Sequence, residues 1–194
     1  YDDDNHERRE IRTLRDTGKT VIGIDVDDAV LNNPTNDENY IISDKWVEKN
    51  RESFDLISAD FVLEHIKDYK KFFFNINKLL KQDGYFCART PHKYSYVALG
   101  SRIIPNWLHP YTLKKAQPKR KDIDVFKAYY NINTISAANR LFRGYRDYSY
   151  LFTPKPAYFS GNKIMRPILD IIHQYFPREF SAQLFIIKQK VNGI

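Results

Sequence analysis

The sequence FDLISADFVLEHI, residues 54–66, decides the fold because it joins a buried strand to a turn that carries polar side chains. Its first part is an apolar run of strand length that ends at Asp60. The following DYKKFFFNINKLLKQDG, residues 68–84, has apolar residues at helical spacing behind an N-cap at Asp68. YFCARTP, residues 85–91, is again typical of a buried strand. The order strand, helix, strand predicts a crossover between parallel strands.

Further predicted strands and helices follow in both directions along the chain. Upstream, TVIGIDVDD (20–28) and YIISD (40–44) each indicate a strand, and these strands end at Asp25 and Asp44. Downstream, NTISAANRLFRGYRD indicates a helix, and DYSYLF and AQLFIIKQK indicate strands on either side of a helical KIMRPILDIIHQYF. We therefore predict an α/β fold with a doubly wound, mostly parallel sheet. In such sheets ligands bind beyond the carboxyl ends of the strands, so Asp25, Asp44 and Asp60 are expected at one crevice.

Composition narrows the function classes. The chain has 194 residues, of which 42% are hydrophobic, and this suits one domain with a buried core. Its single cysteine, Cys87, excludes an internal disulfide and a cysteine metal cluster and favours the cytoplasm. No transmembrane segment is expected. The net charge of +7 favours an anionic partner, although the densest basic segment, residues 114–121, is equally typical of a solvated loop.

The segments VIGIDVD, FDLISADFVLEHI and NKLLKQDGYFCARTP resemble, in this order, segments of class I S-adenosylmethionine-dependent methyltransferases, of the small-molecule type. The resemblance extends from about Glu7 to Lys190 and implies a Rossmann-like sheet with an antiparallel final strand. It implies one domain over residues 1–194, with a substrate-side insertion at about 93–127, and S-adenosylmethionine as the cofactor. The family's first strand and glycine-rich loop would precede a helix that here starts near Asp4. We therefore expect a chain truncated before that loop.

The resemblance also implies a cofactor site. Asp25, with Val26, is expected at the ribose, where a carboxylate accepts hydrogen bonds from both hydroxyls. Asp44 and Lys45 are expected at the adenine. An equally ordinary interpretation makes Asp25 a turn cap and Asp44 an exposed loop residue before a helix.

The resemblance also implies cofactor contacts at Asp60 and Phe61, near the reacting sulfonium. A negative electrostatic field at this point favours the positively charged cofactor. Methyl transfer is an in-line displacement, so positioning supplies much of the rate. Some methyl acceptors lose a proton during the reaction. His65 or His92 is a candidate to accept this proton, because the ordinary pKa of histidine is close to neutral. A histidine that is merely hydrogen-bonded into its turn is the alternative for His65.

Three function classes stay open from the sequence. The first is methyl transfer to a small-molecule or a glycan- or lipid-linked acceptor. The second is nucleic-acid binding or modification through the basic insertion, although the aromatic signatures of RNA modules are absent from the sequence. The third is a non-catalytic interaction protein with a degenerate methyltransferase fold. Residues 163–176 allow peripheral contact with a membrane surface as well.

Overall fold

The structure is a computed structural model that describes residues 19–95, 98, 128–153, 167, 168, 171, 175 and 177–191. The predicted helix near residues 4–18, most of the predicted insertion at 93–127 and most of the predicted helix at 163–176 lie outside these ranges. The chain divides into two compact units, residues 1–50 and 51–194, and each is described by itself. Within the described residues, no helix has the length and apolar character needed to cross a membrane.

The first unit contains two parallel strands. Ile22 pairs with Glu38 and Asp25 with Ile41 along these strands. The 3₁₀ helix after the first strand is capped by Asp27, which accepts a hydrogen bond from the backbone N–H of Ala29 at 2.9 Å. The elements in chain order are β1 (Ile22–Asp25), η1 (Asp28–Asn32), β2 (Glu38–Ile41) and α2 (Asp44–Lys49).

The largest difference from the sequence prediction in this unit is at the end of the second strand. The predicted second strand ended at Asp44, whereas β2 ends at Ile41 and Asp44 is the first residue of α2. The physical reason is Ser43, whose hydroxyl accepts a hydrogen bond from the backbone N–H of Trp46 at 3.1 Å and so starts the helix. Asp44 then lies in the first turn, where a carboxylate is favoured by the helix dipole.

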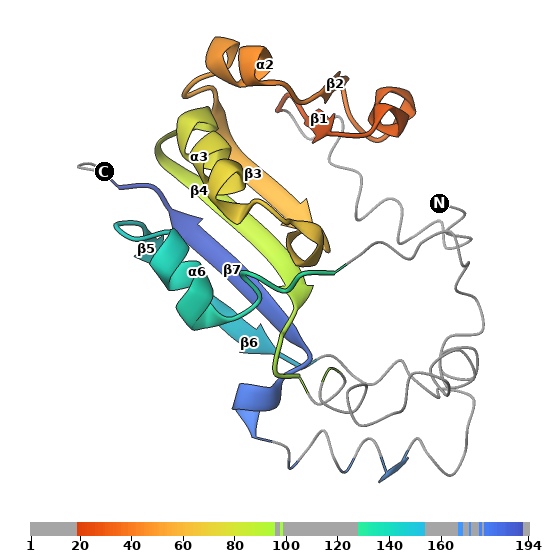
Figure 1. Cartoon of the computed structure of the whole chain (residues 1–194), viewed down its shortest axis with the longest axis vertical. Helices are drawn as coiled ribbons and strands as arrows, with labels where there is room; N and C mark the ends of the chain where they lie inside the picture. The colour runs from red at the N-terminus through yellow and green to blue at the C-terminus, as the bar shows by residue number, and fades with distance from the viewer. Residues whose placement is uncertain are drawn as a thin grey trace. The chain divides into compact units, whose positions relative to one another are not determined.

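The second unit is a five-stranded sheet in the order β3-β4-β7-β5, with β6 also paired to β7 (Figure 1). β3 and β4 are parallel, and β7 is antiparallel to β4, β5 and β6. All strands except β7 therefore run in one direction, as predicted for a mostly parallel sheet with an antiparallel final strand. The elements are β3 (Phe54–Asp60), η2 (Leu63–His65), α3 (Tyr69–Leu79), β4 (Leu80–Pro91), α6 (Ile135–Leu141), β5 (Arg146–Asp147), β6 (Tyr150–Phe152), η5 (Arg178–Phe180) and β7 (Gln183–Gln189).

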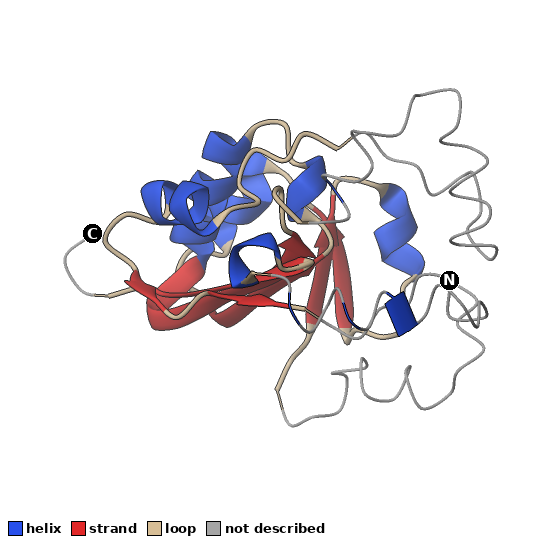
Figure 2. Ribbon diagram, turned by 90° about the horizontal axis from the view of Figure 1, so that it is seen from below, coloured by secondary structure: helices blue, strands red, loops and turns tan. Residues whose placement is uncertain are grey.

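The core of this unit lies between the sheet and the helices α3 and α6, which cover the same face (Figure 2). Phe86 of β4 stacks on Phe142, which follows α6, with ring centroids 5.0 Å apart. Phe73 of α3 meets the edge of Phe142, also at 5.0 Å. One aromatic cluster thus fixes both helices on the sheet.

Candidate active site

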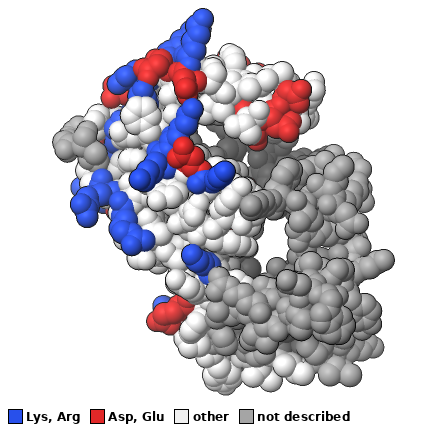
Figure 3. Space-filling model, in the orientation of Figure 1, with Lys and Arg blue, Asp and Glu red and all other residues white. Residues whose placement is uncertain are grey.

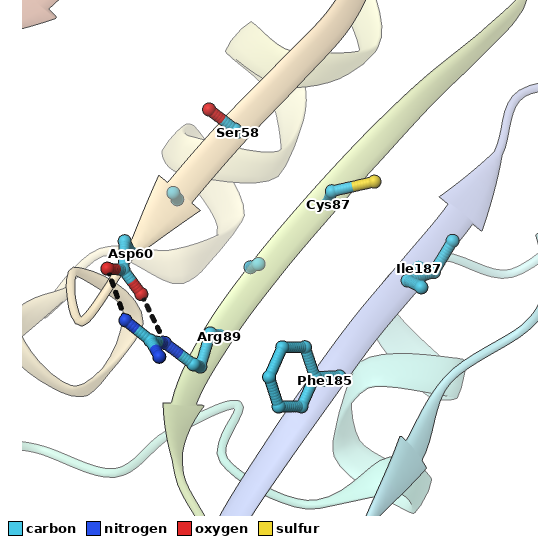
Figure 4. Close-up of a pocket in the computed structure, with 8 residues that line it drawn as sticks. Ser58, Asp60, Cys87, Arg89, Phe185 and Ile187 are labelled. Carbon is cyan, nitrogen blue, oxygen red and sulfur yellow. Dashed lines mark hydrogen bonds and ion pairs between the residues drawn. The ribbon is translucent and has the colours of Figure 1, made fainter. Parts of the chain in front are cut away.

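The carboxyl ends of β3 and β4 carry an ion pair between two neighbouring strands. Asp60 and Arg89 are register partners, and both guanidinium bonds to the carboxylate measure 2.6 Å (Figure 4). The hydrogen bond to Asp60 raises the pKa of Arg89, against the opposing effect of burial. Arg89 was not among the predicted site residues. The signal in the sequence is a charged residue within the otherwise apolar strand YFCARTP, because a partly buried charge needs an oppositely charged partner.

Phe61 follows Asp60 in a left-handed conformation, with φ of 54°. Its backbone N–H donates to the carbonyl of Arg89 at 2.8 Å, and the Arg89 guanidinium lies 4.7 Å from the centroid of its ring. A non-glycine residue in this region of backbone space is strained, and such strain is stored where the surroundings fix the geometry. Asp60, Phe61 and Arg89 therefore form one rigid group at the end of the sheet.

A shallow hollow of about 240 Å³, open to solvent, lies beside this group on the sheet face opposite to α3 and α6. Cys87 lies in its wall, and burial raises the pKa of its thiol. Figure 4 shows the side chains that line it, which come from three adjacent strands: Ser58, Asp60, Cys87, Arg89, Phe185 and Ile187.

A buried hydrogen-bond chain lies on the other side of the strand ends. The side-chain amide of Asn133, just before α6, donates to the hydroxyl of Thr90 at 2.5 Å. That hydroxyl donates to the carboxylate of Glu64 in η2 at 2.8 Å. All three side chains are buried, so the chain ties η2, β4 and the start of α6 together.

His92, the predicted proton acceptor after β4, lies next to this chain and is only 5% exposed. Its backbone N–H donates to Ala182 at 3.1 Å, and the following N–H of Lys93 donates to the carbonyl of Asn133 at 2.9 Å. Burial lowers the pKa of His92, although a hydrogen bond with the Ser181 backbone opposes this effect. Among the residues that the structure describes, its buried Nδ1 atom has no hydrogen-bond partner, and neither has Oδ1 of Asn133. Two acceptor atoms at the end of β4 thus lack a donor.

His65, the other predicted proton acceptor, is the last residue of η2 and is half-buried. Its backbone N–H donates to the carbonyl of Val62 at 3.0 Å. The structure places His65 after β3 and His92 after β4, within the same unit.

In the first unit, Asp25 is the last residue of β1, and its carboxylate turns toward the backbone of the next two residues. Oδ1 accepts the backbone N–H of Val26 at 2.6 Å and that of Asp27 at 3.1 Å. The Val26 side chain is 82% exposed. Asp44 and Lys45 are exposed residues in the first turn of α2. The three strand-terminal aspartates are therefore divided between the two units, and their predicted convergence stays a prediction.

The mostly parallel sheet with helices on its face is a Rossmann-like α/β fold. Acidic residues and histidines follow the carboxyl ends of its strands, where such folds bind ligands. The sequence matches the family described as "Methyltransferase domain" over residues 7–136, and the chain belongs to this family. It is a class I S-adenosylmethionine-dependent methyltransferase, and S-adenosylmethionine is its cofactor. A comparison with curated proteins found no match.

Solved structures confirm the fold. The chain is similar to a SAM-dependent methyltransferase from Archaeoglobus fulgidus, with a TM-score of 0.55 and 15% identity, over 93% of this chain and 80% of that one. It is similar to one from Methanosarcina mazei, with a TM-score of 0.54 and 16% identity, over 90% and 84%. A Thermotoga maritima protein described as a possible histamine N-methyltransferase has a TM-score of 0.52 and 15% identity, over 88% and 72%.

Proposed function

We propose that this methyltransferase acts on a small-molecule or a glycan- or lipid-linked acceptor, and that His92 of the second unit contacts the acceptor. The observation that carries the proposal is His92. Because burial lowers the pKa of His92, the imidazole is neutral at neutral pH, and its buried Nδ1 has no hydrogen-bond donor within the described part of the chain. A neutral imidazole nitrogen with a vacant lone pair is suited to accept a hydrogen bond, and then a proton, from an acceptor hydroxyl or amine.

The chain's own residues fit the cofactor at Asp25. Its Oδ1 is held by two backbone N–H groups, and the exposed carboxylate keeps its second oxygen for a ribose hydroxyl. Asp44 and Lys45 are accessible at the start of α2 for the adenine. When bound, S-adenosylmethionine supplies an activated methyl group on a sulfonium. Asp25 binds and orients, while His92 takes the proton that the acceptor loses.

Asp60 and Phe61 fit the sulfonium less well than the sequence suggested. Both Asp60 oxygens are engaged by Arg89, so the pair presents little net negative charge. We propose that Phe61 and the aliphatic part of Arg89 shape the pocket wall, and that the Asp60 carboxylate positions Arg89 rather than attracting the cation. His65 is proposed as a turn residue near the acceptor. The single cysteine supports a cytoplasmic enzyme.

Calorimetric titration with S-adenosylhomocysteine tests the cofactor part of this proposal. It is done on this chain and on a form extended upstream of Tyr1. Asp25→Ala is expected to lower the affinity at least tenfold, the equivalent of about 1.4 kcal/mol. Asp28→Ala, which removes a neighbouring exposed carboxylate, is the matched control and keeps the affinity. Equal losses in the two variants, or no binding by either form of the protein, would contradict the proposal.

The acceptor part is tested separately, with radiolabelled S-adenosylmethionine and panels of amines, phenols and glycolipids. With a turned-over acceptor, His92→Gln is expected to lower kcat and to remove the acidic limb of its pH profile, because glutamine does not titrate. An unchanged pH profile in this variant would exclude His92 as the proton acceptor while leaving cofactor binding intact.

A further inference from the structure

Asn133 and His92 are neighbours at the carboxyl end of β4. The backbone carbonyl of Asn133 accepts the N–H of Lys93 at 2.9 Å. Its side-chain amide donates to the carbonyl of Pro91 at 3.2 Å. These two peptide groups flank His92, so Asn133 lies against the backbone on both sides of that residue. Both side chains are buried, with 0% of Asn133 and 5% of His92 exposed.

The contacts of Asn133 fix the orientation of its side-chain amide. Nδ2 donates to the Thr90 hydroxyl at 2.5 Å and to the Pro91 carbonyl, and a carbonyl can only accept, so the nitrogen lies on this side. Oδ1 lies on the other side, and no described residue donates to it. The Thr90 hydroxyl in turn donates to the Glu64 carboxylate at 2.8 Å. A chain of this kind polarises the amide and strengthens Oδ1 as an acceptor.

The hydrogen bonds of His92 fix which ring nitrogen carries the proton. Burial lowers the pKa of His92, whereas a hydrogen bond with the Ser181 backbone raises it, as expected when a ring N–H donates. Nδ1 has no partner in the described part of the chain, so the donor is Nε2. The neutral ring therefore keeps a lone pair on Nδ1, and this atom can only accept.

A group that satisfies both atoms must supply two hydrogen-bond donors. A buried acceptor that stays unpaired costs free energy, so a ligand with one donor leaves part of this cost in place. A hydroxyl and a secondary amine each carry one polar hydrogen, whereas a neutral primary amine carries two. When both of its hydrogens are bound, the primary amine still has its lone pair free to attack a methyl group.

Surface charge does not select the ligand in place of these atoms. In the view of Figure 3, acidic and basic side chains both occur on the described surface. Pairs such as Lys81 with Asp55 and Arg89 with Asp60 neutralise one another. The number of donors that the buried acceptors need therefore decides the chemical class of the ligand.

We propose that Nδ1 of His92 and Oδ1 of Asn133 bind a primary amino group of the methyl acceptor, and this inference rests on the function proposed for His92. The nitrogen lone pair forms the bond to the methyl carbon while the carbon–sulfur bond breaks and leaves its electron pair on sulfur. The methylated nitrogen then transfers one proton to Nδ1 of His92. The product keeps one N–H on Oδ1 of Asn133, so a second methylation is disfavoured.

Tyr94 connects the buried imidazole with the surface. Its ring meets the His92 ring edge-on, with centroids 5.8 Å apart, and 49% of the residue is exposed. An acceptor that displaces this ring reaches His92 from the solvent. The apolar body of the acceptor then packs on the same tyrosine, which replaces the contact that the imidazole loses.

The test is a titration of this chain, with and without S-adenosylhomocysteine, followed by ¹⁵N NMR of the His92 ring. The probes are aniline, N-methylaniline and N,N-dimethylaniline in mildly alkaline buffer, because they are neutral and carry two, one and no N–H hydrogens. Aniline is expected to shift the Nδ1 signal and to bind at least about tenfold more tightly than N,N-dimethylaniline. Hydrophobic burial alone would give the opposite order, since each added methyl group increases the apolar area.

Two variants separate ligand binding from a structural role. Asn133→Leu removes Oδ1 and is expected to abolish the preference for aniline. Thr90→Val is the matched control, because it breaks the same hydrogen-bond chain while the Pro91 carbonyl still anchors Nδ2, and it is expected to retain most of the preference. Circular dichroism verifies folding, and the order of the probes on the wild-type protein decides the inference even if Asn133→Leu is unfolded.

An equal or reversed order of affinities would overturn the inference. No shift of the Nδ1 signal with aniline would also overturn it, because water alone then satisfies the two acceptors. Turnover of phenols with a pH profile that depends on His92, together with either result, would keep the proposed function and reject only the assignment of a primary amine.

Discussion

The ion pair between Asp147 and Lys188 gives the most quantitative prediction for stability. The Lys188 ammonium lies 2.7 Å from Oδ1 of Asp147, and its side chain is 1% exposed, whereas that of Asp147 is 32% exposed. Lys188 also donates to Oδ1 of Asn139 on α6. Burial alone would raise the pKa of Asp147, but hydrogen bonds from Lys188 and Ser149 outweigh it and hold the pKa at about 2.

A pKa that falls from 3.8 in the unfolded chain to about 2 in the folded protein stabilises the fold at neutral pH. At about 1.4 kcal/mol per pKa unit this amounts to roughly 2 kcal/mol. Because part of the Asp147 side chain is exposed, screening by solvent reduces the figure to about 1–2 kcal/mol. Asp147→Asn also weakens the pairing of a buried ammonium, so we expect a total loss of about 2–3 kcal/mol at pH 7.

The sign of the pH dependence follows from the lowered pKa. The stabilisation is complete above the unfolded pKa of 3.8 and is lost as pH falls through about 2. Urea unfolding followed by circular dichroism at a series of pH values should therefore show the wild-type protein and Asp147→Asn converging in acid. The variant Lys188→Met, combined with Asp147→Asn, should recover part of the loss, because it removes the buried charge. A difference at pH 7 that persists unchanged to the lowest pH would refute this reasoning.

Three further perturbations test other parts of the structure. Phe142→Ala removes the centre of the aromatic cluster and should lower the free energy of unfolding by about 3–5 kcal/mol in urea titrations; a loss below about 1 kcal/mol would contradict this packing. Gly84→Ala would place a Cβ atom 2.9 Å from the carbonyl oxygen of Lys81, so we expect a loss of about 1–3 kcal/mol, and unchanged stability would disprove the tight contact. Arg89→Gln releases the Asp60 carboxylate and should raise the affinity for cationic S-adenosylmethionine relative to neutral S-adenosylhomocysteine about two- to fivefold by calorimetry; an unchanged ratio would show that Asp60 does not sense the sulfonium.

The fold was largely predictable because the strands are short apolar runs and the helices carry clear caps. The residues 54–60 form β3 as predicted, and Asp68 caps α3 by accepting the N–H of Lys71 at 3.0 Å. Thr134 likewise caps α6 by accepting the N–H of Ala137 at 3.1 Å. The boundary between β2 and α2 was missed, because Ser43 starts the helix within a segment that has strand composition.

The candidate site was less predictable, because its electrostatics depend on partners from distant parts of the chain. The position of Asp60 at a strand end could be derived, but the strand register with Arg89 could not. The burial of His92 and its proximity to Asn133 follow from the pairing of β4 with β7 and from the loop before α6. The effect of these contacts on pKa values and net charge requires three-dimensional structure.

Within the described residues, β3 is hydrogen-bonded along one side only, to β4. An unpaired strand edge can form backbone hydrogen bonds with a strand of another molecule. Leu56, which is half-exposed, adds apolar surface to this edge. The ion pairs of Asp55 with Lys81 and of Asp60 with Arg89 lie near the two ends of β3. Such charged side chains disfavour pairing of this strand with the same strand of a second copy. High salt, which screens these charges, should therefore promote self-association at high protein concentration.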